Sequence, residues 1–84
     1  MINIEARIQG RKISEDEIEE VAICLDNTGI DVLCTLLQKM KSYRAPNHIH
    51  LSTEKGCGEE DLDSSLIEES YTLVNQLRIV KIAD

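Results

Sequence analysis

Two histidines are the residues of this chain whose type and spacing best suit chemistry. His48 and His50 lie two apart in a tract that reads as a strand, so both rings would project from one face, close enough to share a metal ion or a phosphate. A zinc site needs at least a third ligand, and Cys57, between Gly56 and Gly58, could supply it. Because the paired ligand spacings of a structural zinc site are missing, we expect no bound metal and no other cofactor.

The alternating histidines also resemble part of two phosphoryl-transfer families, the histidine-triad hydrolases and the two-His phosphoesterases. The first family needs a third alternating histidine where Ser52 stands, and the second needs another His-x-Ser/Thr motif that this sequence lacks. The sequence also has no Gly-rich phosphate loop before a helix. A small metal- or nucleotide-binding enzyme using His48 and His50 stays open as an alternative, but we expect a protein without catalytic activity.

Charge argues for a protein partner rather than a nucleic acid. The formal net charge is −7, from sixteen acidic and nine basic residues, so phosphate backbones would be repelled. The sequence has no Trp or Phe, which leaves little for base stacking. Most acidic residues fall in two blocks: Glu15, Asp16, Glu17, Glu19 and Glu20, and then Glu59, Glu60, Asp61, Asp63, Glu68 and Glu69. Solvated helix or loop faces explain such blocks as readily as a docking site for a basic protein.

Length and composition predict one domain spanning residues 1–84. The chain is too short for a second core, and 42% hydrophobic with 30% charged residues is typical of a folded domain. It contains neither an export signal nor an apolar run of about eighteen residues, so we expect no membrane association. Three cysteines without a Cys-x-x-Cys pair indicate reduced thiols and a cytoplasmic location.

Periodicity predicts a strand followed by two helices in the first half of the chain. Apolar and polar residues alternate over Ile2–Ile8, which indicates a strand with one face on the core. Ser14 and Glu17 form a capping-box pattern, so a helix is expected from there to Leu25. Thr28 and Asp31 could cap a second helix, which would end before Pro46.

The second half predicts two strands separated by a long polar loop. His48–Thr53 is expected as a strand, Glu54–Ser65 as an exposed loop and Tyr71–Ile82 as a strand. Together these elements predict an α+β fold of order β-α-α-β-β. In it, a small, mainly antiparallel sheet of about three strands packs on two helices.

The stretch from His48 to Ile79 resembles the immunity protein thirty-two family of bacterial polymorphic-toxin systems. The resemblance is carried by three tracts in the same order, His48–Leu51, Gly56–Leu62 and Leu73–Ile79, and covers under half of the chain. One departure lies at Cys57 and its neighbours, where the family pattern has an aromatic residue. The resemblance implies a small cytoplasmic antidote that binds and blocks a cognate toxin and catalyses no reaction.

The second acidic block is the predicted contact for such a toxin, whose substrate site would be basic if it is a nuclease. The loop carboxylates have no helix cap to explain them, and the adjoining sheet face could add hydrogen bonds. The predicted partner-binding residues are Glu59, Glu60, Asp61, Asp63, His48, His50 and Arg78. An adaptor for a protein other than a toxin stays open, and a homodimer is compatible with the sequence.

Overall fold

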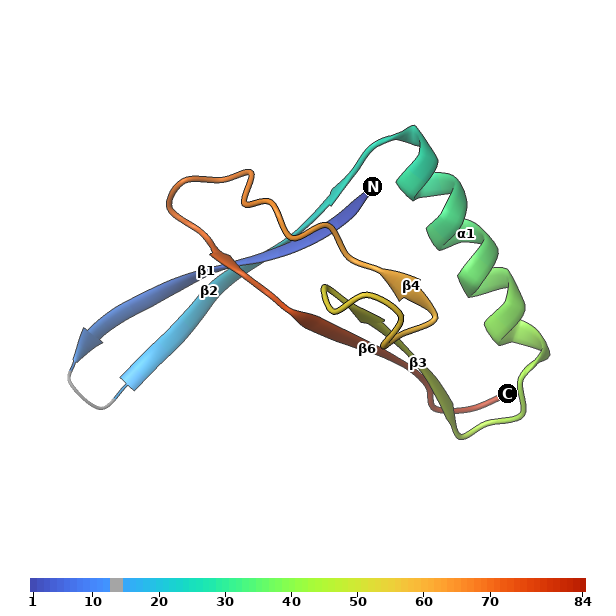
Figure 1. Cartoon of the computed structure of the whole chain (residues 1–84). Coiled ribbons are helices and arrows are strands. Elements are labelled where there is room, and N and C mark those ends of the chain that lie inside the picture. The colour runs from blue at the N-terminus through green and yellow to red at the C-terminus, as the bar shows by residue number, and fades with distance from the viewer. Residues whose placement is uncertain (13–14) are drawn as a thin grey trace.

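The computed structural model describes residues 1–12 and 15–84, which form one helix and six strands (Figure 1). The elements are β1 (Ile2–Lys12), β2 (Glu15–Leu25), α1 (Asn27–Ser42), β3 (Asn47–Ser52), β4 (Glu60–Asp61), β5 (Thr72–Leu73) and β6 (Gln76–Lys81). The strands form two three-stranded sheets, ordered β2-β1-β5 and β4-β3-β6. In Figure 1 the β1–β2 hairpin is a long arm that projects away from the helix and the second sheet.

The predicted order β-α-α-β-β, with one sheet of about three strands on two helices, is wrong. Residues 15–25 form strand β2, antiparallel to β1, instead of a helix. A register shift explains the error: Arg7 pairs with Glu20 but Ile8 pairs with Ile18, so β2 carries an extra residue at Glu19. The bulge places Ile18 and Val21, which are three residues apart in the sequence, on the same face of the strand, and a spacing of three is also typical of one face of a helix. The other half of the expected capping box, Ser14, lies outside the described residues.

The first strand is confirmed, and it runs further than predicted. Ile2, Ile4 and Ala6 are buried, as the alternation required. Ile8 is 42% exposed, because β1 continues to Lys12 and its distal half extends past the core into the arm. The apolar face of β1 therefore belongs to the core from Ile2 to Ala6 and is partly exposed at Ile8.

The second predicted helix is confirmed as α1, although its cap differs. Asp26, rather than Thr28, is the N-cap residue, and its side chain accepts the Gly29 N–H at 2.7 Å. The N-terminal ammonium group of Met1 forms an ion pair with the same carboxylate. A Cβ at Gly29 would lie 1.9 Å from the Met1 carbonyl oxygen, so this close approach requires glycine.

No helix in the described part of the chain is long and apolar enough to cross a membrane.

The core lies where α1 and both sheets meet. Its buried members come from both sheets, from the helix and from the segment after β4: Ile2, Ile4, Met40, Ile49, Leu51 and Leu62. Partly buried residues of α1, including Val32, Leu33 and Leu36, pack against this cluster. The predicted exposed loop Glu54–Ser65 is therefore corrected in part, because it contains the short strand β4 and the buried Leu62.

The predicted C-terminal strand Tyr71–Ile82 is instead two strands in different sheets. β5 pairs with β1 opposite Glu5 and Ala6, whereas β6 pairs with the whole of β3. Between them the Val74 N–H donates to the Ile4 carbonyl at 2.8 Å, and the Asn75 carbonyl accepts the Thr53 N–H at 2.9 Å. This segment therefore links the two sheets through backbone hydrogen bonds.

The second face of β1 is polar and is also buried. Asn3 and Glu5 are both fully buried. The Asn3 amide donates to the carbonyls of Asp63 and Ser65, at 3.1 and 2.8 Å. The Glu5 carboxylate accepts the backbone N–H groups of residues 67 and 68 at 2.6 and 3.0 Å. Segment 63–68 is thus held on β1 by side chains that satisfy its backbone.

Replacing Glu5 with Ala tests this attachment. Two backbone N–H groups would lose a charged acceptor, so we expect the variant to lose about 1–3 kcal/mol of unfolding free energy. Urea denaturation measures the loss, and hydrogen exchange should become faster at the amides of Ile67 and Glu68. Glu69→Ala, at the exposed carboxylate directly after this segment, is the matched control. Equal stability of the two variants would contradict the assigned role of Glu5.

Candidate partner-binding surface

The structure brings the predicted histidines and Arg78 together on the free face of the second sheet. His50 pairs with Arg78 and His48 with Val80, and paired residues of antiparallel strands share a face. The opposite face carries the buried Ile49 and other core residues. The two imidazole rings lie 4.9 Å apart, centroid to centroid, at an interplanar angle of 81°. This surface offers imidazole and guanidinium hydrogen-bonding groups side by side.

Glu59 joins the acidic loop to this face through two reciprocal hydrogen bonds. Its N–H donates to the His50 carbonyl at 2.8 Å, and its carboxylate accepts the His50 N–H at 2.6 Å. The second bond lowers the pKa of Glu59; partial burial opposes this, and the nearby imidazoles of His50 and His48 add to the lowering. The loop is therefore fixed beside the histidines.

Two further loop carboxylates also bind backbone groups. The Asp61 carboxylate accepts the Gly56 N–H at 3.1 Å, and the Asp63 carboxylate accepts the Ser65 N–H at 2.8 Å. The Leu62 N–H donates to the Ser52 carbonyl at 2.7 Å, which attaches the end of the loop to β3. The interpretation that these charges lack a structural reason therefore needs correction, since Glu59, Asp61 and Asp63 each organise the loop.

Glu60 differs from the other predicted loop carboxylates. Within the described part of the chain, no backbone N–H donates to it. It pairs with Leu51 in the parallel β3–β4 ladder, so it lies on the side of the second sheet that faces α1. Of the four predicted loop carboxylates, Glu60 is therefore the one that contributes least to the hydrogen bonding of the loop.

A shallow hollow of about 310 Å³ lies where the loop meets the sheet, lined by His50, Cys57, Gly58 and Glu59 together with Gly56. A Cβ at Gly58 would lie 2.5 Å from the His50 carbonyl oxygen, so glycine permits the close packing of loop and strand. Partial burial raises the pKa of the Cys57 thiol, and the charges of Glu54 and Asp61 raise it further, which favours the protonated form. Across residues 1–12 and 15–84, no group of three His, Cys, Asp or Glu residues is placed to hold a metal ion.

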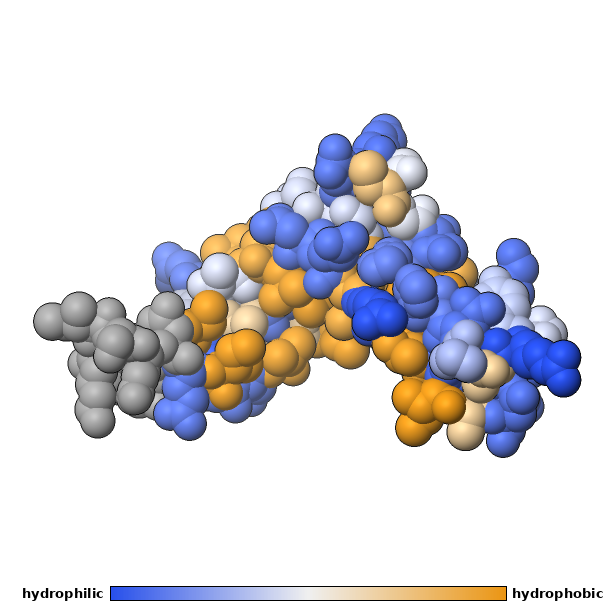
Figure 2. All heavy atoms as spheres, turned by 90° about the horizontal axis from the view of Figure 1, so that it is seen from below, coloured by the Kyte–Doolittle hydropathy of each residue, from blue (hydrophilic) through white to orange (hydrophobic). Residues whose placement is uncertain are grey.

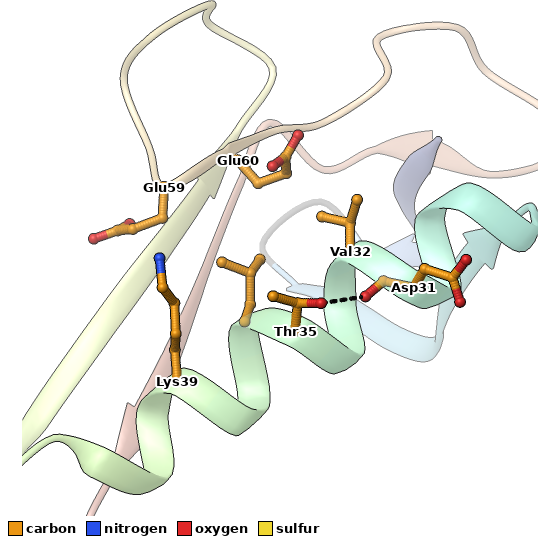
Figure 3. Close-up of a pocket in the computed structure, with 7 residues that line it drawn as sticks. Asp31, Val32, Thr35, Lys39, Glu59 and Glu60 are labelled. Atoms are coloured by element: carbon orange, nitrogen blue, oxygen red, sulfur yellow. Dashed lines mark hydrogen bonds between the residues drawn. The ribbon is translucent and has the colours of Figure 1, made fainter.

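A second hollow, of about 360 Å³, lies between α1 and the acidic loop (Figure 3). Its walls include Val32, Thr35 and Lys39 of the helix and Glu59 and Glu60 of the loop. In Figure 3 the Lys39 ammonium group points toward the Glu59 side of the loop. Sequence analysis missed Lys39 and Gly58, because only the folded chain brings helix, loop and strand together.

Comparison with protein-family models, with curated proteins and with solved structures found no match for this chain.

The hydrogen bond between Glu59 and His50 makes a prediction about pH. The pKa of Glu59 is lower in the folded protein than in the unfolded chain. The ionised carboxylate therefore contributes fully to stability at pH values above the ordinary pKa of glutamate. That contribution disappears as the pH falls through the lowered folded-state pKa. In an NMR titration the His50 amide shift should follow this lowered pKa, and Glu59→Gln should abolish that acidic transition. A His50 amide that titrates identically in both proteins would show that the carboxylate does not bind there.

Proposed function

We propose that this protein is a cytoplasmic immunity protein that binds a cognate bacterial toxin and blocks it, without catalysing a reaction. The observation that carries the proposal is the fixed acidic loop beside the exposed histidine and arginine face. The resemblance of residues 48–79 to an immunity family supplies the class of partner. The local geometry supplies the surface that such a partner would contact.

The net charge of −7 supports a toxin with a basic surface. Opposite charge accelerates diffusional encounter, and an acidic inhibitor would cover the substrate site of a nuclease. The carboxylates of Glu59 and Asp61 would supply the attraction next to the histidine face, and the charge of Glu60, on the side of the sheet that faces α1, would add to it at longer range. Because backbone hydrogen bonds already hold the loop, little conformational entropy would be lost when the partner binds.

Specificity would come from the sheet face next to the loop. Arg78 can form a bidentate hydrogen bond with a carboxylate, and each imidazole can donate or accept according to its protonation state. A partner that presents only positive charge would leave these groups unpaired. The complete surface therefore selects a basic region with at least one acidic or carbonyl acceptor at the position opposite Arg78.

Co-expression tests the proposed function directly. The neighbouring reading frames of the gene should include a toxin whose expression stops growth of a bacterial host. Co-expression of this protein should restore growth, and the two proteins should copurify as a stable complex. Failure to restore growth against every toxin-like neighbour would overturn the proposal. Stoichiometric zinc or substrate turnover in the purified protein would support the enzyme alternative instead.

Two single substitutions separate the effect of charge from the effect of loop geometry. Glu60→Gln removes a charge without removing a backbone acceptor, so toxin association should slow roughly fivefold at low salt, equivalent to about 1 kcal/mol. Gly58→Ala keeps every charge but forces the loop away from the His50 carbonyl, so dissociation should become faster. Stopped-flow binding across a salt series distinguishes the two effects. Unchanged rates in both variants would place the interface elsewhere on the molecule.

A further inference from the structure

Among the described residues the two sheets have four outer edges, and only β6 gives a long and regular one. β4 and β5 are outer strands of two residues each. The third outer strand, β2, is interrupted by the bulge at Glu19, and the charges of Glu17, Glu19 and Glu20 oppose its pairing with another strand. The fourth, β6, has six residues, pairs with β3 without a register shift and contains no proline, glycine or carboxylate. β6 is therefore the edge best suited to accept a further strand.

The hydrogen bonding of β3 determines which backbone groups of β6 point outward. The N–H and C=O of His50 both bind Glu59, on the β4 side of β3. His50 and Arg78 are therefore a non-hydrogen-bonded pair of the antiparallel ladder, so the N–H and C=O of Arg78 point away from β3. By alternation, the same groups of Val80 also point outward. These groups present the hydrogen-bonding pattern that an extended chain matches.

The protein itself uses this edge only before β6 begins. The Val74 N–H donates to the Ile4 carbonyl at 2.8 Å, and β1 pairs with β5 but not with β6. At the other end of β6, the Asp84 carboxylate accepts the Ala45 N–H at 3.1 Å, which holds the C-terminal residues beside the segment before β3. Within the part of the chain that the structure describes, the outer edge of β6 is thus uncovered.

An apolar hollow of about 230 Å³ lies beside this edge, between β6 and the last turns of α1. The Leu37 side chain in its wall is 44% exposed. The Lys81 ammonium group donates to the carbonyls of Lys41 and Tyr43 at 3.0 and 2.7 Å, which holds the strand against the end of the helix. Figure 2 shows hydrophobic surface at this end of the molecule as well as along the arm. The lining residues are Leu37, Met40 and Lys41 of α1 and Ile79, Val80 and Lys81 of β6.

The opposite face of β6 carries a positive charge. Arg78 lies there beside the histidines, and it forms no ion pair within residues 1–12 and 15–84. A residue directly opposite Arg78 on an added strand would share its face, so a carboxylate at that position would form a charge-assisted hydrogen bond. The next residue along the added strand would face α1 and the hollow. The edge therefore matches an extended segment in which acidic and apolar residues alternate.

We propose that β6 binds an extended segment of a partner protein, which adds a fourth strand to the β4-β3-β6 sheet. The backbone of that segment would pair with Arg78 and Val80, an aliphatic side chain would enter the hollow beside Leu37, and a carboxylate would bind Arg78. A second copy of β6 fits poorly, because antiparallel pairing in the central registers would set the two Arg78 side chains opposite or diagonal to each other. The inference goes beyond the proposed toxin complex, which uses the acidic loop at the opposite edge of this sheet.

A peptide titration of the full chain followed by NMR tests the proposal. The probe is an end-capped peptide as long as β6 in which valine alternates with glutamate. At saturating peptide, hydrogen exchange at the Arg78 and Val80 amides should slow by about tenfold or more, because both would gain a backbone acceptor. The Ile79 amide, which already bonds to β3, should change less. A matched peptide with lysine in place of glutamate should bind at least about fivefold more weakly, and Arg78→Gln should remove that preference.

Proline substitution at Val80 tests the backbone pairing itself. Val80→Pro removes an outward N–H that the described chain does not use, and proline is tolerated on the open side of an edge strand. It should weaken peptide binding by about tenfold or more. Val80→Thr is the matched control, because it keeps the N–H and a β-branched side chain, and it should bind nearly as well as the natural sequence. Circular dichroism reports the fold of each variant.

Three results would overturn the proposal. They are unchanged exchange at the Arg78 and Val80 amides at millimolar peptide, equal binding by folded Val80→Pro and Val80→Thr, and equal binding of the glutamate and lysine peptides. Protection of the same amides that rises with protein concentration alone would assign the edge to a second copy and would overturn it as well. Growth rescue by co-expression needs no peptide, so it tests the toxin proposal separately.

Discussion

The fold depends on a first strand that is buried on both faces. One side of β1 supplies isoleucines to the core, and the other side carries Asn3 and Glu5, which are fully buried. Burial of such polar groups is costly unless they are hydrogen-bonded, and the backbone of segment 63–68 supplies partners to the Glu5 carboxylate and to the Asn3 amide nitrogen, although Asn3 Oδ1 has no partner among the described residues. The same bonds set the course of the chain toward β5 and β6. The face that carries the histidines is therefore positioned by polar groups in the other sheet.

Elements with an uninterrupted local pattern could be predicted from the sequence. The alternation over Ile2–Ile8, the apolar stripe of α1 and the two-residue period of His48–Ser52 each survive in the structure. In these segments, packing against the rest of the chain does not change the spacing at which the apolar residues recur. The side of the second sheet on which His48 and His50 lie could be predicted for the same reason.

Elements whose form depends on distant partners could not be predicted. The bulge at Glu19 is visible only against β1, and it turns the strand spacing between Ile18 and Val21 into an apparent helical one. The break between β5 and β6 likewise reflects competition between two sheets, since Val74 binds Ile4 while Asn75 binds Thr53. The residues between Leu73 and Gln76 give no sign in the sequence of such a change of sheet. The order of the loop has the same origin, because composition cannot show that a carboxylate accepts a backbone N–H.

The described carboxylates of the two acidic blocks differ in their place in the fold. In the loop, the carboxylates of Glu59, Asp61 and Asp63 each accept a backbone N–H, so these charged groups also fix the course of the loop. On the arm, Glu17, Glu19 and Glu20 line an outer strand whose edge would otherwise pair with any extended chain. Charges on an edge strand oppose such pairing.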